Sequence, residues 1–300
     1  MLEIKGTYTA IVTPFKKNGE VDFEGLRENI RFQIENNIDG IVPCGTTGES
    51  ATLSMEEHKK IIDVCVDECN GKIKVIAGTG SNNTKEALEL TKHAKDTGAD
   101  ACLLISPYYN KPTQEGIYQH FKKISEIDIP LILYNIQSRT AVNIEPETVK
   151  RLMEIDNIIG IKEASSNFDQ ISKIIYFARD RKNFSVISGN DSQTLPIIAL
   201  GGKGVISVIS NIIPKETKQL VDYCLNGNFE EARKIHYRIL NLMNVAFIET
   251  NPIPIKYMMN KMKEKGMRGM NAGTLRLPLV ELSEKNKIKV DEALKEYGLI

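Results

Sequence analysis

Residues 131–164 read LILYNIQSRTAVNIEPETVKRLMEIDNIIGIKEA, and this stretch contains the repeating unit that decides the fold. It begins with the apolar run LILYN (131–135), continues with helical spacing near 145–154, and ends in the apolar run IIGIKEA (158–164). Neither run alternates between apolar and polar residues, which is typical of strands buried on both faces of a parallel sheet. The stretch therefore predicts a strand, a helix and a second, parallel strand.

The same unit recurs in both directions along the chain. Further apolar runs predict strands at YTAIVTP (8–14), GIVPCG (40–45), KVIAGTG (74–80), ACLLISP (101–107), FSVISGN (184–190) and GVISVIS (204–210). Helical spacing predicts helices near 23–36, 54–70, 83–97, 113–127, 145–154, 167–181, 192–200 and 214–226. Ser54 and Glu57 have capping-box spacing, which supports the start of the second helix.

Eight strand patterns alternating with eight helix patterns predict an α/β fold, a (β/α)8 TIM barrel, over residues 1–226. A doubly wound open sheet is the alternative. Residues 227–300 break the alternation. FEEARKIHYRILNLMNVAFIE has a helical period that continues around Pro252 and Pro254, and KVDEALKEYG predicts a final helix. We expect this C-terminal helical region to pack on the barrel.

Composition excludes several classes of protein. Hydrophobic residues make up 41% of the 300 residues, enough for a large core, which excludes a disordered chain. The 39 basic and 39 acidic residues balance, which argues against a dedicated nucleic-acid-binding protein. No apolar run approaches the roughly 18 residues of a membrane span, and Glu3 and Lys5 make the N-terminus too charged for a signal peptide. We therefore expect neither a nucleic acid nor a membrane as a partner.

The cysteines and histidines indicate the compartment and argue against a metal site. The 5 cysteines are odd in number and form no CxxC pair, so we expect a reducing, cytoplasmic environment rather than a disulfide framework. The 4 histidines are scattered and form no HExxH motif. Gly78-Thr79-Gly80 lacks the third glycine of a dinucleotide-binding turn, where Asn83 stands. We expect no metal and no nucleotide cofactor.

A (β/α)8 barrel places its active site at the C-terminal ends of the strands and in the loops that follow. Lys162 lies near such an end and interrupts an apolar run. Burial there removes hydration from the ammonium group, so its pKa falls and the neutral amine can attack a carbonyl substrate to form a Schiff base. The alternative is an ion pair with Glu163 or another carboxylate at the rim of the barrel.

Other residues at these strand ends are compatible with the same chemistry. The hydroxyl of Tyr134 could relay protons beside an imine, or its ring could close the barrel core. Thr46 and Thr47 could bind a small carboxylate, although a turn before a helix has the same composition. Arg139 could bind a second carboxylate through two hydrogen bonds, or remain solvated. The same ends also carry Tyr108, Tyr109, Gly189, Asn190, Asp191, Ile206 and Ser207.

Several motifs together resemble a known family. They are GTTGESATL (45–53), PYYNKPTQEGIYQHF (107–121), YNIQSRT (134–140), IIGIKEAS (158–165), SGND (188–191), GGKGVISV (201–208) and NPIPIKYMM (251–259). In this order they resemble the pyruvate-dependent class I aldolase superfamily, and within it the dihydrodipicolinate synthase family. The resemblance runs from about Tyr8 into the C-terminal helices.

The resemblance implies a lyase of diaminopimelate and lysine biosynthesis. Its members join pyruvate to L-aspartate-4-semialdehyde through a Schiff base and release 4-hydroxy-tetrahydrodipicolinate, without a metal or an organic cofactor. The resemblance further implies a homotetramer built as a dimer of dimers. Two alternatives remain. One is another pyruvate aldolase, such as an N-acetylneuraminate lyase or a 2-keto-3-deoxy-sugar-acid aldolase, and the other is a non-catalytic ligand-binding paralogue.

The resemblance also implies roles for individual residues. Lys162 matches the Schiff-base lysine and Tyr134 the tyrosine that gives and takes protons, with Thr46 and Tyr109 as relay partners. Tyr109 is expected to reach across a dimer interface. The substrate-binding positions implied are Thr47, Gly189 and Ile206 for pyruvate, and Arg139 for the carboxylate of aspartate semialdehyde.

Two positions depart from the family pattern. Gln137 stands where the family usually has proline, which leaves the placement of Arg139 less secure than that of Lys162. In members inhibited by lysine, the resemblance places an allosteric lysine site at Ser50, Ala51, His58, Asn82, Glu86 and Tyr108. A histidine of that site in some members is Met55 here, which argues against lysine sensitivity.

Overall fold

The chain forms a closed parallel barrel, in a computed structural model that describes residues 2–181 and 183–300. Each strand pairs with its sequence neighbours, and β8 pairs with β1 to close the ring. The strands are β1 (Gly6–Thr9), β2 (Gly40–Ile41), β3 (Lys74–Gly78), β4 (Ala101–Ile105), β5 (Leu131–Asn135), β6 (Ile158–Glu163), β7 (Ser185–Ser188) and β8 (Gly204–Ser207). The predicted (β/α)8 barrel is confirmed, and the open sheet is wrong.

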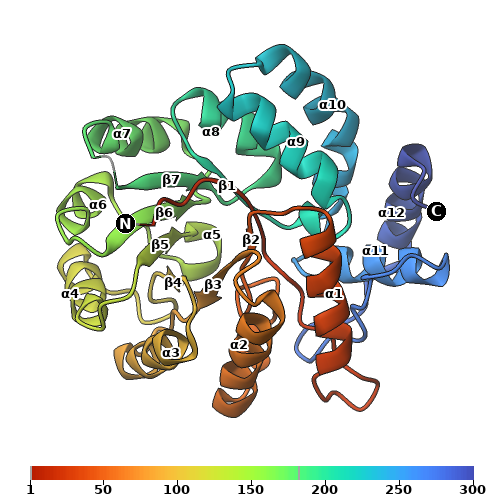
Figure 1. The fold of residues 1–300 in the computed structure, drawn as a ribbon, viewed down its shortest axis with the longest axis horizontal. Coiled ribbons are helices and arrows are strands. Elements are labelled where there is room, and N and C mark those ends of the chain that lie inside the picture. Colours follow the sequence, from red (N-terminus) through yellow and green to blue (C-terminus); the bar gives the residue numbers. More distant parts are fainter. Residues whose placement is uncertain (1, 182) are drawn as a thin grey trace.

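Helices surround the barrel on its outside (Figure 1). They are α1 (Phe23–Glu35), α2 (Met55–Cys69), α3 (Thr84–Thr97), α4 (Gln114–Ser125), α6 (Pro146–Leu152), α7 (Phe168–Ala178), α8 (Thr194–Ala199) and α9 (Pro214–Leu225), whereas the short α5 (Gln137–Thr140) lies over the end of the barrel in Figure 1. Ser54 and Glu57 form the predicted capping box at the start of α2. The one-turn helix α5 was not predicted, and it carries Arg139, which the sequence placed in a loop.

The register of the strands decides which side chains enter the barrel. Tyr134 on β5 lies directly opposite Lys162 on β6, and Tyr8 on β1 lies opposite Ile206 on β8. Tyr8, Tyr134 and Ile206 belong to one buried cluster. Because neighbouring residues of a strand point to opposite faces, Lys162 points into the barrel with Tyr134, and Glu163 points out toward the helices.

Seven of the eight strands are shorter than the sequence predicted, and β1 lies at Gly6–Thr9 instead of 8–14. The early ends of β2 and β8 each have a physical reason. The strand expected over 40–45 ends at Ile41, and Cys44 further along has a positive φ of 55°, which turns the chain out of an extended path. The strand expected over 204–210 ends at Ser207. The backbone N–H groups of Val208 and Ile209 donate instead to the carboxylate of Asp191, and the chain continues as a short 3₁₀ turn, η3 (Ile209–Asn211).

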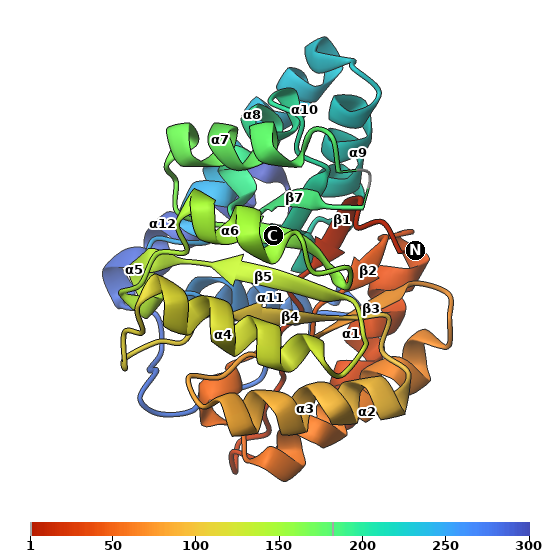
Figure 2. The same ribbon diagram turned by 90° about the vertical axis from the view of Figure 1, so that its left-hand side faces the viewer.

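The C-terminal part of the chain is helical, as predicted, with α10 (Phe229–Val245), α11 (Ile253–Glu264) and α12 (Glu284–Tyr297). The predicted continuous helical period is interrupted before Pro252: α10 ends at Val245 and α11 begins at Ile253, with Pro254 in its first turn. Figure 2 shows α5 and α12 on the side that the C-terminal end of β5 faces. The division of the chain at residue 226 stays a prediction. No helix in the described ranges is long and apolar enough to cross a membrane.

Candidate active site

Lys162 and Tyr134 form the centre of the site, inside the barrel near the ends of two adjacent strands. The Lys162 side chain is buried, with 6% of the residue exposed, and its Nζ lies 4.3 Å from the centre of the Tyr134 ring. Strand pairing places the two residues directly opposite each other, so their contact is fixed by the backbone rather than by a loop. The Lys162 amine and the Tyr134 phenol are therefore neighbours, as the sequence predicted.

The surroundings of Lys162 make its amine a nucleophile near neutral pH. Burial lowers the pKa of Lys162 to about 8, the Asp191 carboxylate opposes this shift, and the Arg139 guanidinium adds to it. The alternative ion pair with Glu163 is wrong. The Glu163 carboxylate points outward and accepts hydrogen bonds from the side chains of Asn135 and Gln170, at 3.1–3.2 Å, and from a backbone N–H.

Tyr134 is buried and carries a neutral phenol. Burial raises its pKa to about 12, while Arg139 and a side-chain hydrogen bond with Thr46 both oppose that shift. A phenol that keeps its proton can donate it to a leaving oxygen, and a neighbouring hydroxyl can return a proton to it. Thr46 lines the same cavity as Tyr134, and its part in a relay stays a prediction.

Asn251 connects the two expected anion-binding groups. Its side-chain Nδ2 donates to the Thr47 hydroxyl at 2.9 Å, and its backbone oxygen accepts a hydrogen bond from the Arg139 guanidinium at 3.0 Å. Arg139 itself is exposed on α5, so this single bond orients an otherwise solvated cation. Gln137, the departure from the family pattern, is the exposed first residue of that turn, and the turn forms with glutamine there.

Gly189 lies beside Lys162, and Ile206 lies in the barrel opposite Tyr8. A Cβ added at Gly189 would lie 3.2 Å from Lys162 Cε and 2.7 Å from the Ala164 Cβ, so a side chain there would crowd the lysine. Ile206 is fully buried on β8. Gly189 is therefore close to the space around the Lys162 side chain, and the role of Ile206 in binding stays a prediction.

Asp191 was not given a role by the sequence, although it follows β7 at the correct end of the barrel. Its Oδ2 accepts from the backbone N–H groups of Val208 and Ile209, at 2.9 and 3.2 Å. Its Oδ1 is buried and has no hydrogen-bond partner among the described residues. Burial raises the pKa of Asp191, and the two backbone hydrogen bonds oppose that shift.

A cavity of about 400 Å³ opens beside the site, with Thr46, Tyr134, Arg139 and Asn251 in its wall. Most residues of the expected lysine site line the same cavity, namely Ser50, Ala51, His58, Glu86 and Tyr108, together with Met55. Asn82 is not among the lining residues, and its backbone oxygen accepts a hydrogen bond from Asn110 instead. His58 bonds to the backbone oxygen of Gly78 at 2.7 Å, and burial lowers its pKa.

Tyr109 is the one expected relay residue that this chain does not bring to Tyr134. It is 89% exposed, it has a positive φ of 73°, and it is not among the residues that line the cavity. Asn251, like Asp191, was given no role by the sequence, although it is the first residue of the motif NPIPIKYMM (251–259). No cluster of described residues has the acidic, histidine and cysteine side chains of a metal site.

These features define a class, a (β/α)8 barrel whose buried lysine can form a Schiff base. Comparisons with known proteins identify the family within this class. The Dihydrodipicolinate synthetase family model matches residues 3–297. The chain is 58% identical over 298 residues to the 4-hydroxy-tetrahydrodipicolinate synthase of Methanocaldococcus jannaschii. The match covers 99% of each chain. The chain belongs to the dihydrodipicolinate synthetase family.

Solved structures of similar proteins agree in fold over the whole length. The dihydrodipicolinate synthase of Aquifex aeolicus is 50% identical with a TM-score of 0.94, and the match covers 99% of each chain. The dihydrodipicolinate synthase of Acinetobacter baumannii, solved in complex with pyruvate, is 43% identical with a TM-score of 0.94, and the match covers 99% of this chain and 100% of that one.

Proposed function

We propose that this chain condenses pyruvate with L-aspartate-4-semialdehyde and releases 4-hydroxy-tetrahydrodipicolinate. The single observation that carries the proposal is the buried amine of Lys162, with its pKa lowered to about 8, opposite Tyr134 in a chain of this family. The Acinetobacter baumannii relative was solved with pyruvate, which supports pyruvate as the first substrate. The chain is then a lyase of diaminopimelate and lysine biosynthesis.

The chemistry starts at the Lys162 amine. The neutral amine attacks the ketone carbon of pyruvate, and loss of water gives a protonated imine. This cation draws electrons from the adjacent methyl group, which loses a proton and becomes the nucleophilic carbon of an enamine. That carbon attacks the aldehyde and forms the new C–C bond. The amine of the second substrate then displaces Lys162, which closes the ring and frees the enzyme. In this sequence of steps the protonated imine serves as the electron sink.

The remaining residues have roles in binding and proton transfer. Tyr134 gives and takes the protons of imine formation and ring closure, and the Thr46 hydroxyl shares them. Thr47, Gly189 and Ile206 surround the pyruvate unit. Arg139, held at its edge of the cavity by Asn251, binds the carboxylate of the aldehyde substrate. Tyr109 completes the relay from a second subunit, which makes the functional unit at least a dimer.

Three further features complete the proposal. The assembly is a homotetramer of two dimers. The reaction requires no metal and no organic cofactor, because the imine supplies the electron sink. The compartment is the cytoplasm, where the five free, buried cysteines stay reduced. Lysine binding at the cavity residues is weak or absent, because Met55 offers no polar group there.

Aldehyde selectivity tests the function. We expect product formation from pyruvate and aspartate semialdehyde to be at least about 100-fold more efficient, in kcat/KM, than condensation with a sugar aldehyde, because a fixed cation suits a short anionic aldehyde. Arg139→Gln should remove most of that preference by raising KM for aspartate semialdehyde. A higher kcat/KM for a sugar aldehyde would favour the N-acetylneuraminate lyase type of reaction. Lack of condensation with either would favour a binding protein.

A further inference from the structure

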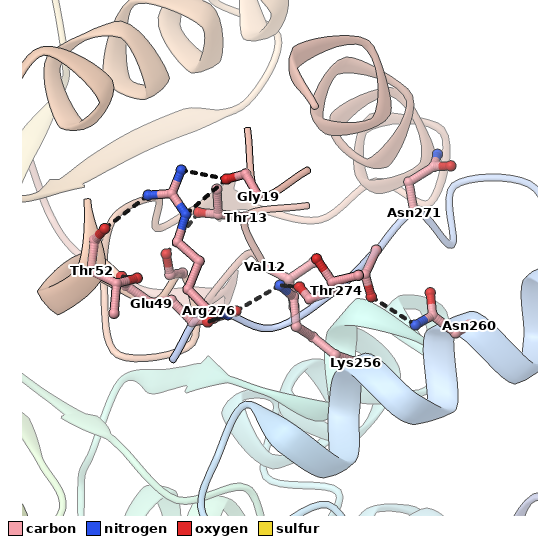
Figure 3. A network of polar contacts seen from close by, with 12 residues as sticks. Val12, Thr13, Gly19, Glu49, Thr52, Lys256, Asn260, Asn271, Thr274 and Arg276 are labelled. Carbon is pink, nitrogen blue, oxygen red and sulfur yellow. Dashed lines mark hydrogen bonds and ion pairs between the residues drawn. The ribbon is translucent and has the colours of Figure 1, made fainter. Parts of the chain in front are cut away.

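A buried ion pair joins the C-terminal helices to the loop that follows β2. The Nζ of Lys256, on α11, lies 2.6 Å from the Glu49 carboxylate, and these side chains are 2% and 0% exposed. The same Nζ donates to the backbone oxygen of Thr274 at 2.8 Å and lies 4.4 Å from the centre of the Phe15 ring. Figure 3 shows Lys256 reaching from its helix toward Glu49 and Thr274.

The second oxygen of Glu49 is also held by the C-terminal segment. It accepts from the backbone N–H of Arg276 at 3.1 Å. The Arg276 guanidinium in turn donates to the backbone oxygens of Gly19 and Thr52, on either side of it in Figure 3. Both carboxylate oxygens of Glu49 are therefore fixed by residues more than 200 positions away in the chain.

Glu49 ends the loop that carries Thr46 and Thr47. Its backbone has a φ of 52° and a ψ of 38°, a left-handed conformation that a residue with a side chain adopts only at a cost of about 1–2 kcal/mol. Its N–H donates to the Thr46 backbone oxygen at 3.1 Å, so the position of Glu49 is transmitted to Thr46. Thr47 is fixed from the same segment, through Asn251 just before α11. The conformation of this loop thus depends on two anchors from α11 and its approach.

A buried ion pair is a poor source of stability, because removing two charges from water offsets most of their attraction. Its clearer effect is on geometry. The pair fixes a strained turn in which Thr46 lines the cavity and Thr47 accepts a hydrogen bond from Asn251, and the Glu49 carboxylate is fully buried. A second lysine in an apolar run, IPIKYMM, gives the same sequence signal as Lys162.

We propose that Lys256 is a positioning residue for the reaction: through Glu49 it holds the loop of Thr46 and Thr47 in the geometry that receives the carboxylate of pyruvate. This inference rests on the proposed function. Lys256 makes no contact with substrate in this account, so its loss should weaken pyruvate binding and leave the aldehyde site at Arg139 intact.

Lys256→Met tests the proposal, because methionine keeps the length and removes the charge. We expect the pyruvate concentration for half-maximal borohydride trapping, and the pyruvate KM, to rise about tenfold or more, since small misplacements of a binding group are costly. The KM for aspartate semialdehyde should change less than about twofold. An unchanged pyruvate KM would overturn the proposal.

The double variant Lys256→Met/Glu49→Gln separates positioning from stability. It removes both buried charges, so we expect the melting temperature to return most of the way to that of the wild type while the pyruvate KM stays raised. This variant also carries the test if Lys256→Met alone fails to fold. If both the pyruvate KM and the melting temperature of the double variant returned to the wild-type values, the Lys256–Glu49 pair would have only a structural role, and the proposal would be overturned.

Lys218→Met is the matched control. Lys218 on α9 contacts both carboxylate oxygens of Asp39 at 3.0 Å, and Asp39 immediately precedes β2 at the opposite end of the barrel. We expect this variant to lower the melting temperature without changing the pyruvate KM, and a comparable rise in KM would overturn the proposal. Trapping of pyruvate by the wild type is measured first, and its absence would overturn the proposed function and this inference together.

Discussion

At the scale of the residue, the reactivity of Lys162 comes from its place inside the barrel. Burial lowers the pKa of its amine to about 8, and two charged neighbours act on it in opposite directions, Asp191 raising the pKa and Arg139 lowering it. A surface lysine keeps its pKa near 10.4 and is almost wholly protonated at neutral pH. The barrel thus makes the amine available without a second catalytic base beside it.

The pH dependence of imine formation follows from this pKa. Below about pH 8 the amine is protonated and cannot attack, so the rate constant for pyruvate imine formation should fall about tenfold per pH unit below it and level off above it. Stopped-flow or quenched borohydride trapping between pH 6 and 10 measures this profile. A profile that keeps rising to pH 10 would show a lysine with an ordinary pKa.

Charge substitutions around Lys162 should move that profile in opposite directions. Asp191→Asn removes the charge that raises the pKa of Lys162, so the midpoint of the profile should shift to lower pH. Arg139→Gln removes the charge that lowers it, so the midpoint should shift to higher pH. The asparagine can still accept the N–H groups of Val208 and Ile209, which keeps the fold. Shifts of the same sign in both variants would contradict this account of the site.

Lys162 could be predicted from the sequence because a lysine inside an apolar strand is a local signal. Asn251 and Asp191 could not be assigned a role in this way. The contact of Asn251 with Thr47 spans 204 positions, and the effect of Asp191 on Lys162 depends on how two strand ends meet. Such contacts exist only once the barrel has closed, so no local pattern contains them.

At the scale of the element, closure of the barrel depends on two glycines where β1 meets β8. Gly6 and Gly204 lie opposite each other, and a Cβ added at Gly204 would lie 1.9 Å from the backbone oxygen of Gly6. The strands approach too closely there for any side chain. The periodicity of the sequence predicts the strands of the barrel, but the end of β2 at Ile41 is set by a backbone turn and the end of β8 at Ser207 by Asp191.

Gly204→Ala should therefore disrupt closure. We expect a loss of about 3 kcal/mol or more in the free energy of unfolding, because the backbone of β1 must move. Gly227→Ala is the control, since Gly227 also has a positive φ, of 76°, but nothing lies within 4 Å of the added Cβ, so it should cost only about 1–2 kcal/mol. Denaturant unfolding measures both, and equal losses would contradict the role of close approach.

At the scale of the whole molecule, the single chain does not complete the proposed relay. Tyr109 is 89% exposed and lies outside the cavity wall, whereas Lys162, Tyr134 and Thr46 are brought together within one barrel. The family resemblance places Tyr109 in the site of a neighbouring copy. Sequence periodicity carries no information on such a contact, because it describes how one chain buries its own side chains.

Mixed assemblies test the sharing of Tyr109. Tyr109→Phe should lower turnover about 10-fold or more while leaving the assembly mass unchanged, and Lys162→Arg should abolish activity. When the two variants are unfolded together and refolded as hybrids, a site with Lys162 from one chain and Tyr109 from the other is restored. We expect activity above the average of the two parents, measured beside the mass of the assembly. Activity equal to that average, in assemblies shown to contain both chains, would contradict the sharing of Tyr109 between subunits.

The central claim is that pyruvate becomes covalently bound to Lys162, and reductive trapping tests it most directly. The protein is treated with borohydride in the presence of pyruvate, digested, and mapped by mass spectrometry, with Lys162→Arg as the control. We expect one reduced pyruvate on the peptide that contains Lys162, and none in the variant. An unmodified Lys162, or an adduct on another lysine, would contradict the account.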